Sequence, residues 1–229
     1  MLQFKLSKTL AGDLKMHVSK PLETNAGMMQ WYGHRVTVMN RKCVLLMEYN
    51  TRYCMVFTGL TKPDFENFPD LFRERLWREV VSICELDEQQ SEYLAALVQI
   101  VTEQQHYQTG SDRSVQAHLR QAADEFDYMV NRQTERLPER GEEEFGCGVS
   151  LNEMLRKTGG DKDYFRPLEE FRDFWRGMLE YSQRGKGPDS LERTDSLERT
   201  DSLERTNSPA QMNDVELPDN VIPFPVKTE

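Results

Sequence analysis

Three apolar runs within residues 35–58 constrain the fold of this chain more than any other feature of its sequence. The runs are rich in β-branched and aromatic side chains, and the dipeptides Asn40-Arg41 and Asn50-Thr51 separate them. Runs of this composition joined by two-residue turns are typical of β-hairpins. The pattern therefore predicts a three-stranded antiparallel meander, with strands over residues 35–39, 43–49 and 53–58.

Two-residue turns also decide which side chains share a face of this sheet, because successive residues of a strand point to opposite faces. One predicted face carries Val36, Val38, Cys43, Leu45, Met47, Cys54 and Val56. The other carries Met39, Val44, Leu46, Tyr53, Met55 and Phe57. Both faces are largely apolar, so we expect helices to cover the sheet on both sides, at least in part.

The flanking segments supply the other elements. A short strand is predicted over residues 3–6, and a helix follows from Ser7 to about residue 18. After the meander, apolar residues at three-to-four spacing predict three helices. The stripe of the first consists of Phe65, Phe68, Phe72, Leu76, Val80 and Ile83. Asp87 opens the second, and Ser111 or Asp112 caps the third. The predicted fold class is α+β, with a small antiparallel sheet (the N-terminal strand plus the meander) covered by helices.

The chain divides into three predicted parts. An α+β domain covers residues 1–132, a linker with a docked helical extension covers 133–183, and a disordered tail covers 184–229. The acidic run at residues 142–144 is predicted to lie in the linker, where such a run can bind a cation but is more often solvated. In the extension, Ser150 is expected to cap a short helix and Pro167 to begin a longer one.

The tail contains the six-residue unit DSLERT three times, over residues 189–206. Repeat architectures stack units of about 20–50 residues, so this short unit predicts a disordered spacer. Beyond it lies an apolar segment from Val221 to Val226. That segment either docks on a protein partner or is inert.

The charge of the chain is distributed unevenly. Its net charge is −10, yet residues 1–60 hold eight Lys and Arg against three Asp and Glu. Such asymmetry is typical either of an anionic ligand or of docking between a basic and an acidic part, and both interpretations stay open. The overall acidity argues against broad binding of duplex nucleic acid, which depends on neutralising phosphates.

Composition also bears on the compartment. The longest aliphatic run, residues 43–47, is far shorter than the roughly 20 residues of a membrane span, and no secretory signal is evident. Cys43, Cys54, Cys84 and Cys147 form no C-x-x-C pair and have no histidine at zinc-finger spacing. We therefore predict a cytoplasmic protein with reduced thiols, without membrane association, and with neither a metal nor a cofactor.

A candidate binding site follows from the predicted topology. An up-down-up meander places its second turn beside the entrance to its first strand, which should gather Trp31, Tyr32, His34, Arg35, Thr51 and Arg52. We expect Trp31, His34 and Arg52 to lie within one side-chain reach. Exposed turns often carry charge only for solubility, and that interpretation stays open. The alternative is an anion or phosphate site, where arginines hold the anion and an aromatic ring stacks.

Two functional hypotheses follow. The leading one is a non-catalytic binding or accessory protein, since no Walker, dinucleotide, nucleophile-elbow or metalloprotease motif is present. The alternative is a nucleic-acid-processing enzyme in which His34 acts as a general acid or base beside Arg35 and Arg52. The geometry of the site distinguishes the two hypotheses, because the enzyme requires the side chains of His34, Arg35 and Arg52 to converge.

Three segments together resemble a family. They are FKLSKTL, NRKCVLLMEYNTRYCMVFTGL and TGSDRSVQAHL, and over residues 1–130 they are similar to a bacterial family classed as a domain of unknown function. The shared features fall at Lys8, at Trp31, and at Thr109 with Arg113 and Ser114, which adds Arg113 to the candidate binding residues. Where the family commonly has asparagine three positions after the tryptophan, this chain has His34. The resemblance implies a domain boundary and a bacterial cytoplasmic setting, and no activity.

The predicted helix stripe can be tested by mutation. Leu76→Asp should lower the free energy of unfolding by several kcal/mol, because it places a charge between helix and sheet. Arg41→Ala, at an exposed turn, should leave stability close to that of the wild type. Urea denaturation measures both, and equal losses would show that the stripe is misassigned.

Overall fold

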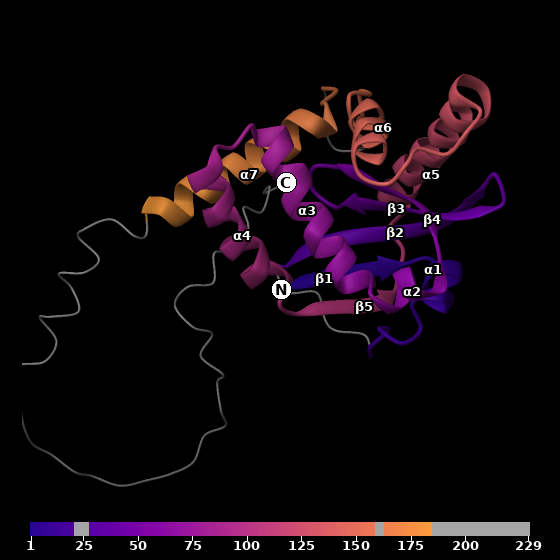
Figure 1. Ribbon diagram of the computed structural model, residues 1–229, viewed down its shortest axis with the longest axis horizontal. Helices are drawn as coiled ribbons and strands as arrows, with labels where there is room; N and C mark the ends of the chain where they lie inside the picture. The colour runs from indigo at the N-terminus through magenta and orange to yellow at the C-terminus, as the bar shows by residue number, and fades with distance from the viewer. Residues whose placement is uncertain (21–27, 159–162, 185–229) are drawn as a thin grey trace, which may run out of the picture.

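The computed structural model describes residues 1–20, 28–158 and 163–184. A five-stranded sheet lies at its centre, in the order β4-β3-β2-β1-β5 (Figure 1). The strands are β1 (Leu2–Leu6), β2 (Met29–Val38), β3 (Arg41–Glu48), β4 (Cys54–Leu60) and β5 (Gln105–Thr109). The α+β class is confirmed. The predicted spacer with its DSLERT units and the segment from Val221 to Val226 lie outside the described residues.

The meander forms with its predicted faces but with a different first turn. Met39 and Asn40, both at positive φ, make the turn, so Val38 pairs with Arg41. Cys43 then pairs with Val36 instead of Val38, a shift by two residues that leaves the strand side chains on their predicted faces, whereas Met39 lies in the turn and is exposed. Around the second turn, Met47 pairs with Cys54, as expected.

The sheet is mixed and not purely antiparallel. β1 lies between β2 and β5 and runs parallel to both. β5, with the sequence QHYQT, is a strand that the sequence pattern did not predict, because four of its five residues are polar. Its position depends on Tyr107, which is buried and stacks on Phe4 with 4.5 Å between ring centroids. Tertiary packing, rather than local propensity, makes this segment a strand.

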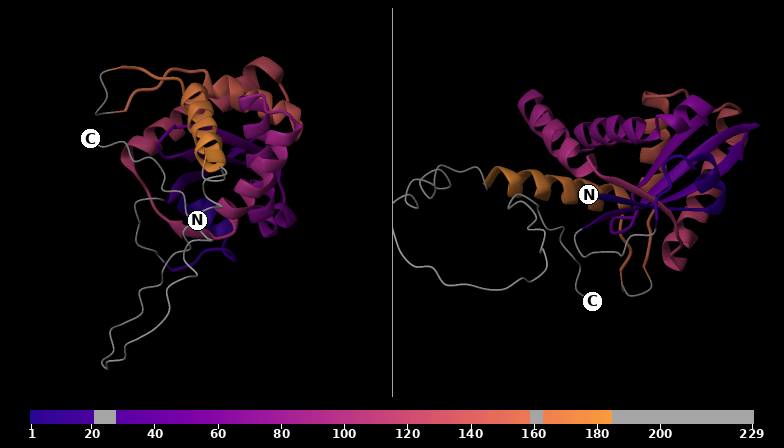
Figure 2. Two further views of the ribbon diagram at one scale, coloured as in Figure 1. Left: turned by 90° about the vertical axis from the view of Figure 1, so that its left-hand side faces the viewer. Right: turned by 90° about the horizontal axis from the view of Figure 1, so that it is seen from below.

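Helices cover both faces of the sheet (Figure 2). They are α1 (Lys8–Asp13), α2 (Lys62–Glu66), α3 (Phe68–Cys84), α4 (Glu88–Thr102), α5 (Arg113–Tyr128), α6 (Glu142–Asn152) and α7 (Pro167–Arg184), with a π-helical segment η1 (Met129–Thr134) after α5. One core contains residues of α3, α4 and α7, including the fully buried Leu76. A second core, on the opposite face, contains residues of α5, including Phe126. None of the described helices has both the length and the apolar character needed to cross a bilayer.

The ends of the helices follow the predicted signals in part. Ser7 caps α1, but that helix stops at Asp13 and is shorter than expected. Asp87 caps α4 with a full capping box, and Asp112 caps α5. The apolar stripe before residue 84 is buried, although it is divided between α2 and α3, which meet at Asn67.

Residues 142–152 are helical, which corrects the prediction of a linker there, whereas residues 135–141 form no helix. α6 begins at Glu142, and Ser150 lies near its end. The three glutamates in its first turn favour a helix start, because carboxylates interact well with the N-terminal helix dipole. Glu142 and Glu143 are exposed but Glu144 is buried, so the acidic run is not solvated throughout.

Side chains of α6 close the outer edge of β4. The Asn152 side chain accepts a hydrogen bond from Cys54 N at 2.7 Å and donates one to Cys54 O at 2.8 Å. Glu144 Oε1 accepts from Thr58 N at 2.6 Å. These contacts satisfy backbone groups that an open sheet edge would present to other chains.

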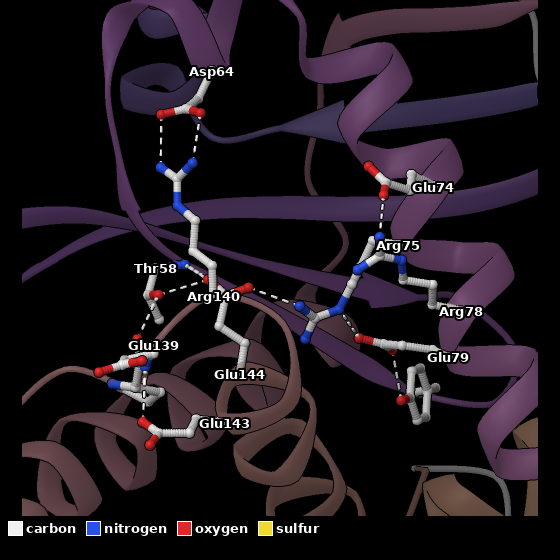
Figure 3. Close-up of polar contacts among 12 residues, drawn as sticks. Thr58, Asp64, Glu74, Arg75, Arg78, Glu79, Glu139, Arg140, Glu143 and Glu144 are labelled. Atoms are coloured by element: carbon white, nitrogen blue, oxygen red, sulfur yellow. Dashed lines mark hydrogen bonds and ion pairs between the residues drawn. The ribbon is translucent and has the colours of Figure 1, made fainter.

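A buried ionic network connects this edge to α3 (Figure 3). Arg75 Nη1 donates to Glu144 Oε2 at 2.7 Å, and Arg75 Nε donates to Glu79 Oε1 at 2.5 Å. The Tyr53 hydroxyl donates to Glu79 Oε2 at 2.7 Å. Burial raises the pKa of Glu79, and the charge of Arg75 opposes that rise. One guanidinium therefore stabilises two carboxylates that are both out of water.

Removing that guanidinium gives a sharp test of the network. Arg75→Met should lower the free energy of unfolding at pH 7 by roughly 3–5 kcal/mol, because it leaves two buried carboxylates unpaired. Burial raises the pKa of Glu79, and without Arg75 nothing in the pair opposes that rise, so the folded variant holds a proton that the unfolded chain releases. The loss of stability should therefore shrink as pH falls towards about 5.

The matched control is Arg78→Met, three residues along α3. Arg78 pairs with Glu74 at 2.5 Å on the exposed side of the helix, so its loss should leave stability close to that of the wild type. Denaturation at several pH values compares the two. Equal effects, or a loss from Arg75→Met that does not depend on pH, would contradict the network.

Candidate functional site

A pocket lies where β1 and β5 end and α5 begins. Its volume is about 140 Å³. The polar residues that line it, called the basic pocket here, are Lys5, Ser7, Tyr32, His34, Gln116 and Arg120. β1 and β5 run parallel and the chain leaves both at the same end of the sheet, at Ser7 and Gly110. The carboxyl ends of parallel strands are the usual ligand position in open sheets with helices on both faces.

Local sequence explains this arrangement. Lys5 and Tyr32 sit opposite each other on the paired strands β1 and β2. Gly110 allows the chain to cross close to Lys5, because a Cβ there would lie 3.2 Å from the Lys5 side chain. Gln116 and Arg120 are four residues apart and therefore lie on one flank of α5.

The basic pocket is electropositive. Lys5, His34 and Arg120 come from three different elements, and none of the described residues that line the pocket is acidic. Burial lowers the pKa of Lys5, an effect that Asp112 partly opposes. Burial, and then the charges of Arg120 and Arg35, lower the pKa of His34. Burial raises the pKa of Tyr32 to about 12, so its hydroxyl stays protonated. These groups are suited to binding an anion.

A row of stacked groups extends from this pocket to Arg52. The Lys5 ammonium lies 5.4 Å from the centroid of the Tyr32 ring, and that ring stacks on Tyr49 with 6.0 Å between centroids. The Arg52 guanidinium lies 5.0 Å from the Tyr49 ring and donates to the Tyr49 carbonyl. Its Nη2 also contacts Ser114 Oγ, at 3.4 Å, in the first turn of α5. His34 and Arg52 thus share the α5 face of the sheet.

Trp31 and Arg35 face the other side. Trp31 is fully buried in the opposite core, with its ring 5.2 Å from Phe72. Arg35 Nη1 pairs with Asp13 Oδ2 at 3.3 Å. Residues 31 and 35 alternate with 32 and 34 along β2, so their side chains point away from His34. The expectation that the side chains of Trp31, His34 and Arg52 lie within reach of one another is therefore wrong.

The remaining predicted residues have structural or exposed positions. Thr51 is buried in the second turn, where its N and Oγ1 donate to Glu48 Oε2 at 2.6 and 2.8 Å. Arg113 is exposed in the first turn of α5. The trio of His34, Arg35 and Arg52 does not converge, because Arg35 lies on the opposite face.

Sequence reasoning missed Lys5, Gln116 and Arg120. The four-residue spacing of Gln116 and Arg120 predicts that both lie on one side of a helix, but it does not predict which part of the protein that side faces. Placing Lys5 beside them requires the position of β1 next to β2, which no local pattern encodes. Among residues 1–20, 28–158 and 163–184, no three His, Cys, Asp or Glu side chains are grouped so as to hold a metal ion.

The lowered pKa of His34 predicts a pH dependence of stability in anion-free buffer. Burial, and then the charges of Arg120 on α5 and Arg35 on β2, disfavour its protonated form. The unfolded chain binds this proton near the ordinary value of 6.5 while the folded chain resists it, so stability should fall as pH drops below about 6.5.

The variant that tests this is His34→Gln, which should remove part of that fall. His106→Gln is the control, because His106 lies outside the pocket on β5. Urea denaturation from about pH 7.5 to 5.5 spans the window in which histidine titrates. Identical pH profiles for His34→Gln and the wild type would contradict the prediction.

Comparison with known proteins gives one positive finding. A family model described as a domain of unknown function, DUF6933, matches residues 3–170. This span contains all of the sheet except Leu2, every residue of the basic pocket and α6, so it extends well past the 130 residues of the expected resemblance. None of the curated proteins compared with the chain matches it. Because the match covers well over half of the chain, the protein belongs to the DUF6933 family of domains of unknown function.

Proposed function

We propose that this protein is a non-catalytic binding module of the bacterial cytoplasm, and that its basic pocket holds the phosphate-type group of a small molecule. The observation that carries the proposal is the convergence of Lys5, His34 and Arg120 on one pocket without an acidic lining residue. Lys5 and His34 are half-buried and Arg120 is exposed, so the pocket presents positive charge that solvent still reaches in part. A bound anion pairs with these partly desolvated donors, whose charged forms burial disfavours.

The size of the pocket limits what it admits. Pockets for drug-sized ligands span about 300–1,000 Å³, whereas this one has a volume of about 140 Å³. The pocket is therefore suited to a single anionic group with few attached atoms, while the rest of the ligand stays outside. The net charge of −10 repels long polyanions, which favours a small anionic ligand over nucleic acid.

The surroundings of His34 support binding rather than catalysis. A histidine that moves protons is normally oriented by a second group, often a carboxylate. His34 has no carboxylate among the lining residues, and Arg35, which the enzyme hypothesis required, pairs with Asp13 on the other face. The buried, free cysteines fit a reducing compartment.

Titration with inorganic phosphate tests the proposal. Calorimetry measures the affinity, and NMR of the histidine rings reports the site. Phosphate should raise the pKa of His34, because a nearby anion favours the protonated ring. Arg120→Gln should weaken binding about tenfold, the cost of one charge-assisted contact.

Arg41→Gln is the control, since Arg41 is an exposed arginine in the first hairpin, outside the basic pocket. It should bind phosphate like the wild type. Equal affinities for Arg120→Gln and Arg41→Gln, or a His34 ring that does not respond to phosphate, would overturn the proposed function.

A further inference from the structure

We propose that the protein holds a second, buried oxyanion between Arg52 and Arg156, on the opposite flank of α5 from the basic pocket. Arg156 lies between α6 and α7 and pairs with Phe165 through two backbone hydrogen bonds, both at 2.9 Å. Its side chain reaches into the protein, where the residue is 2 % exposed. Arg52 is 6 % exposed.

The donors of this arginine pair are poorly satisfied. Arg156 Nη1 contacts the His118 carbonyl at 3.3 Å and Gln121 Oε1 at 3.4 Å, both long for hydrogen bonds to a guanidinium. Its Nε and Nη2 are buried without a partner, as is Nε of Arg52. Buried donors left unpaired are costly, and those of a charged group cost more than those of a neutral one.

The pair also lacks a carboxylate of its own. Within the described residues, no ion pair includes Arg52 or Arg156. Arg75 is buried to a similar degree and has two carboxylates within 2.7 Å. Arg75 Nη2 is also buried without a hydrogen bond, so the difference between Arg75 and this pair lies in the counter-charge and not in complete pairing of donors.

The nearby acids are engaged elsewhere. Asp112 and Glu48 are close enough to raise the pKa of Arg52, against the larger lowering by burial. Glu48 accepts hydrogen bonds from Asn50 and Thr51, and Asp112 Oδ1 accepts from Val115 N. Neither is shown donating or accepting a hydrogen bond with Arg52, so Arg52 Nε stays available.

The geometry of the unpaired atoms indicates the ligand class. Nε and Nη2 form one edge of a guanidinium, and this edge binds two oxygens of a carboxylate or phosphate at once. Arg52 and Arg156 are also near enough that the charge of Arg52, after burial, lowers the pKa of Arg156. A compact oxyanion between them satisfies the donors and removes the repulsion.

His118 provides a reporter for this site. It lies one turn from Ser114 on α5, the flank that meets Arg52, and its Nε2 donates to the Lys157 carbonyl at 3.2 Å. Burial and then the charges of Arg156 and Arg52 lower the pKa of His118. A bound oxyanion should reverse part of that lowering. Gln116 and Arg120 lie on the other flank, so the two sites respond separately.

The experiment uses the full chain with Arg120→Gln, in which the basic pocket binds phosphate about tenfold more weakly, and titrates inorganic phosphate and, in a second arm, acetate. Either anion should raise the melting temperature and the pKa of His118. The arm with the larger effect distinguishes phosphate from carboxylate recognition. Adding Arg156→Met, which preserves side-chain volume, should weaken binding about tenfold or more.

Anion-free buffer gives an independent readout. An empty anion site predicts that Arg156→Met melts no lower than its parent there and melts lower than its parent once phosphate is added. A purely structural arginine predicts a lower melting temperature in both buffers. If Arg156→Met does not fold, Arg52→Gln takes its place. A His118 ring that ignores both anions, or equal anion affinity with and without Arg156, would overturn the second site, whatever the result at His34.

Discussion

One buried guanidinium joins the parts of this protein. Arg75 of α3 binds carboxylates from α3 and from α6, and through Glu79 and Glu144 the same network reaches Tyr53 and the backbone of β4. Tyr53 in turn stacks on Phe171 of α7, with 3.9 Å between ring centroids. The packing of α3, the edge of β4, α6 and α7 therefore depends on the pairing of charges around Arg75. Apolar packing alone tolerates many arrangements, whereas a buried network of this kind is satisfied in few.

The position of β1 has the same importance for the candidate sites. Because β1 lies between β2 and β5, Lys5 is placed beside Tyr32, and the chain after β5 returns over the sheet as α5. α5 then separates two basic regions, one at His34 and Arg120 and the other at Arg52 and Arg156. Ion pairs between the parts do not account for the uneven charge of the sequence, because within the described residues none joins residues 1–60 to a later segment.

The meander and the faces of its strands could be predicted from sequence, because alternation and turn residues are local signals. The strand residues lie on their predicted faces although the first turn begins at Met39, because a shift of the strand pairing by two residues leaves each of them on the same face. The site could be predicted only in part. His34 and Arg52 lie on the same face of the sheet, whereas Trp31 and Arg35 lie on the opposite face. The alternation of side chains along β2 alone could have excluded Trp31 and Arg35 from the predicted site. Lys5, Arg120 and Arg156 depend on contacts between distant segments. The strand β5 and the burial of Glu144 could not be predicted for the same reason.

The central place of β1 also has a consequence for biosynthesis. During synthesis β1 gains its second neighbour only after Thr109 has been made, about a hundred residues later. Until then the edge of β1 that faces β5 stays open, and Phe4 lacks the ring of Tyr107 that covers it. Pairings of such long sequence separation form slowly, because the loop must close before the contact contributes. A nascent chain therefore has no assembled basic pocket until α5 has been made, because Gln116 and Arg120 line that pocket.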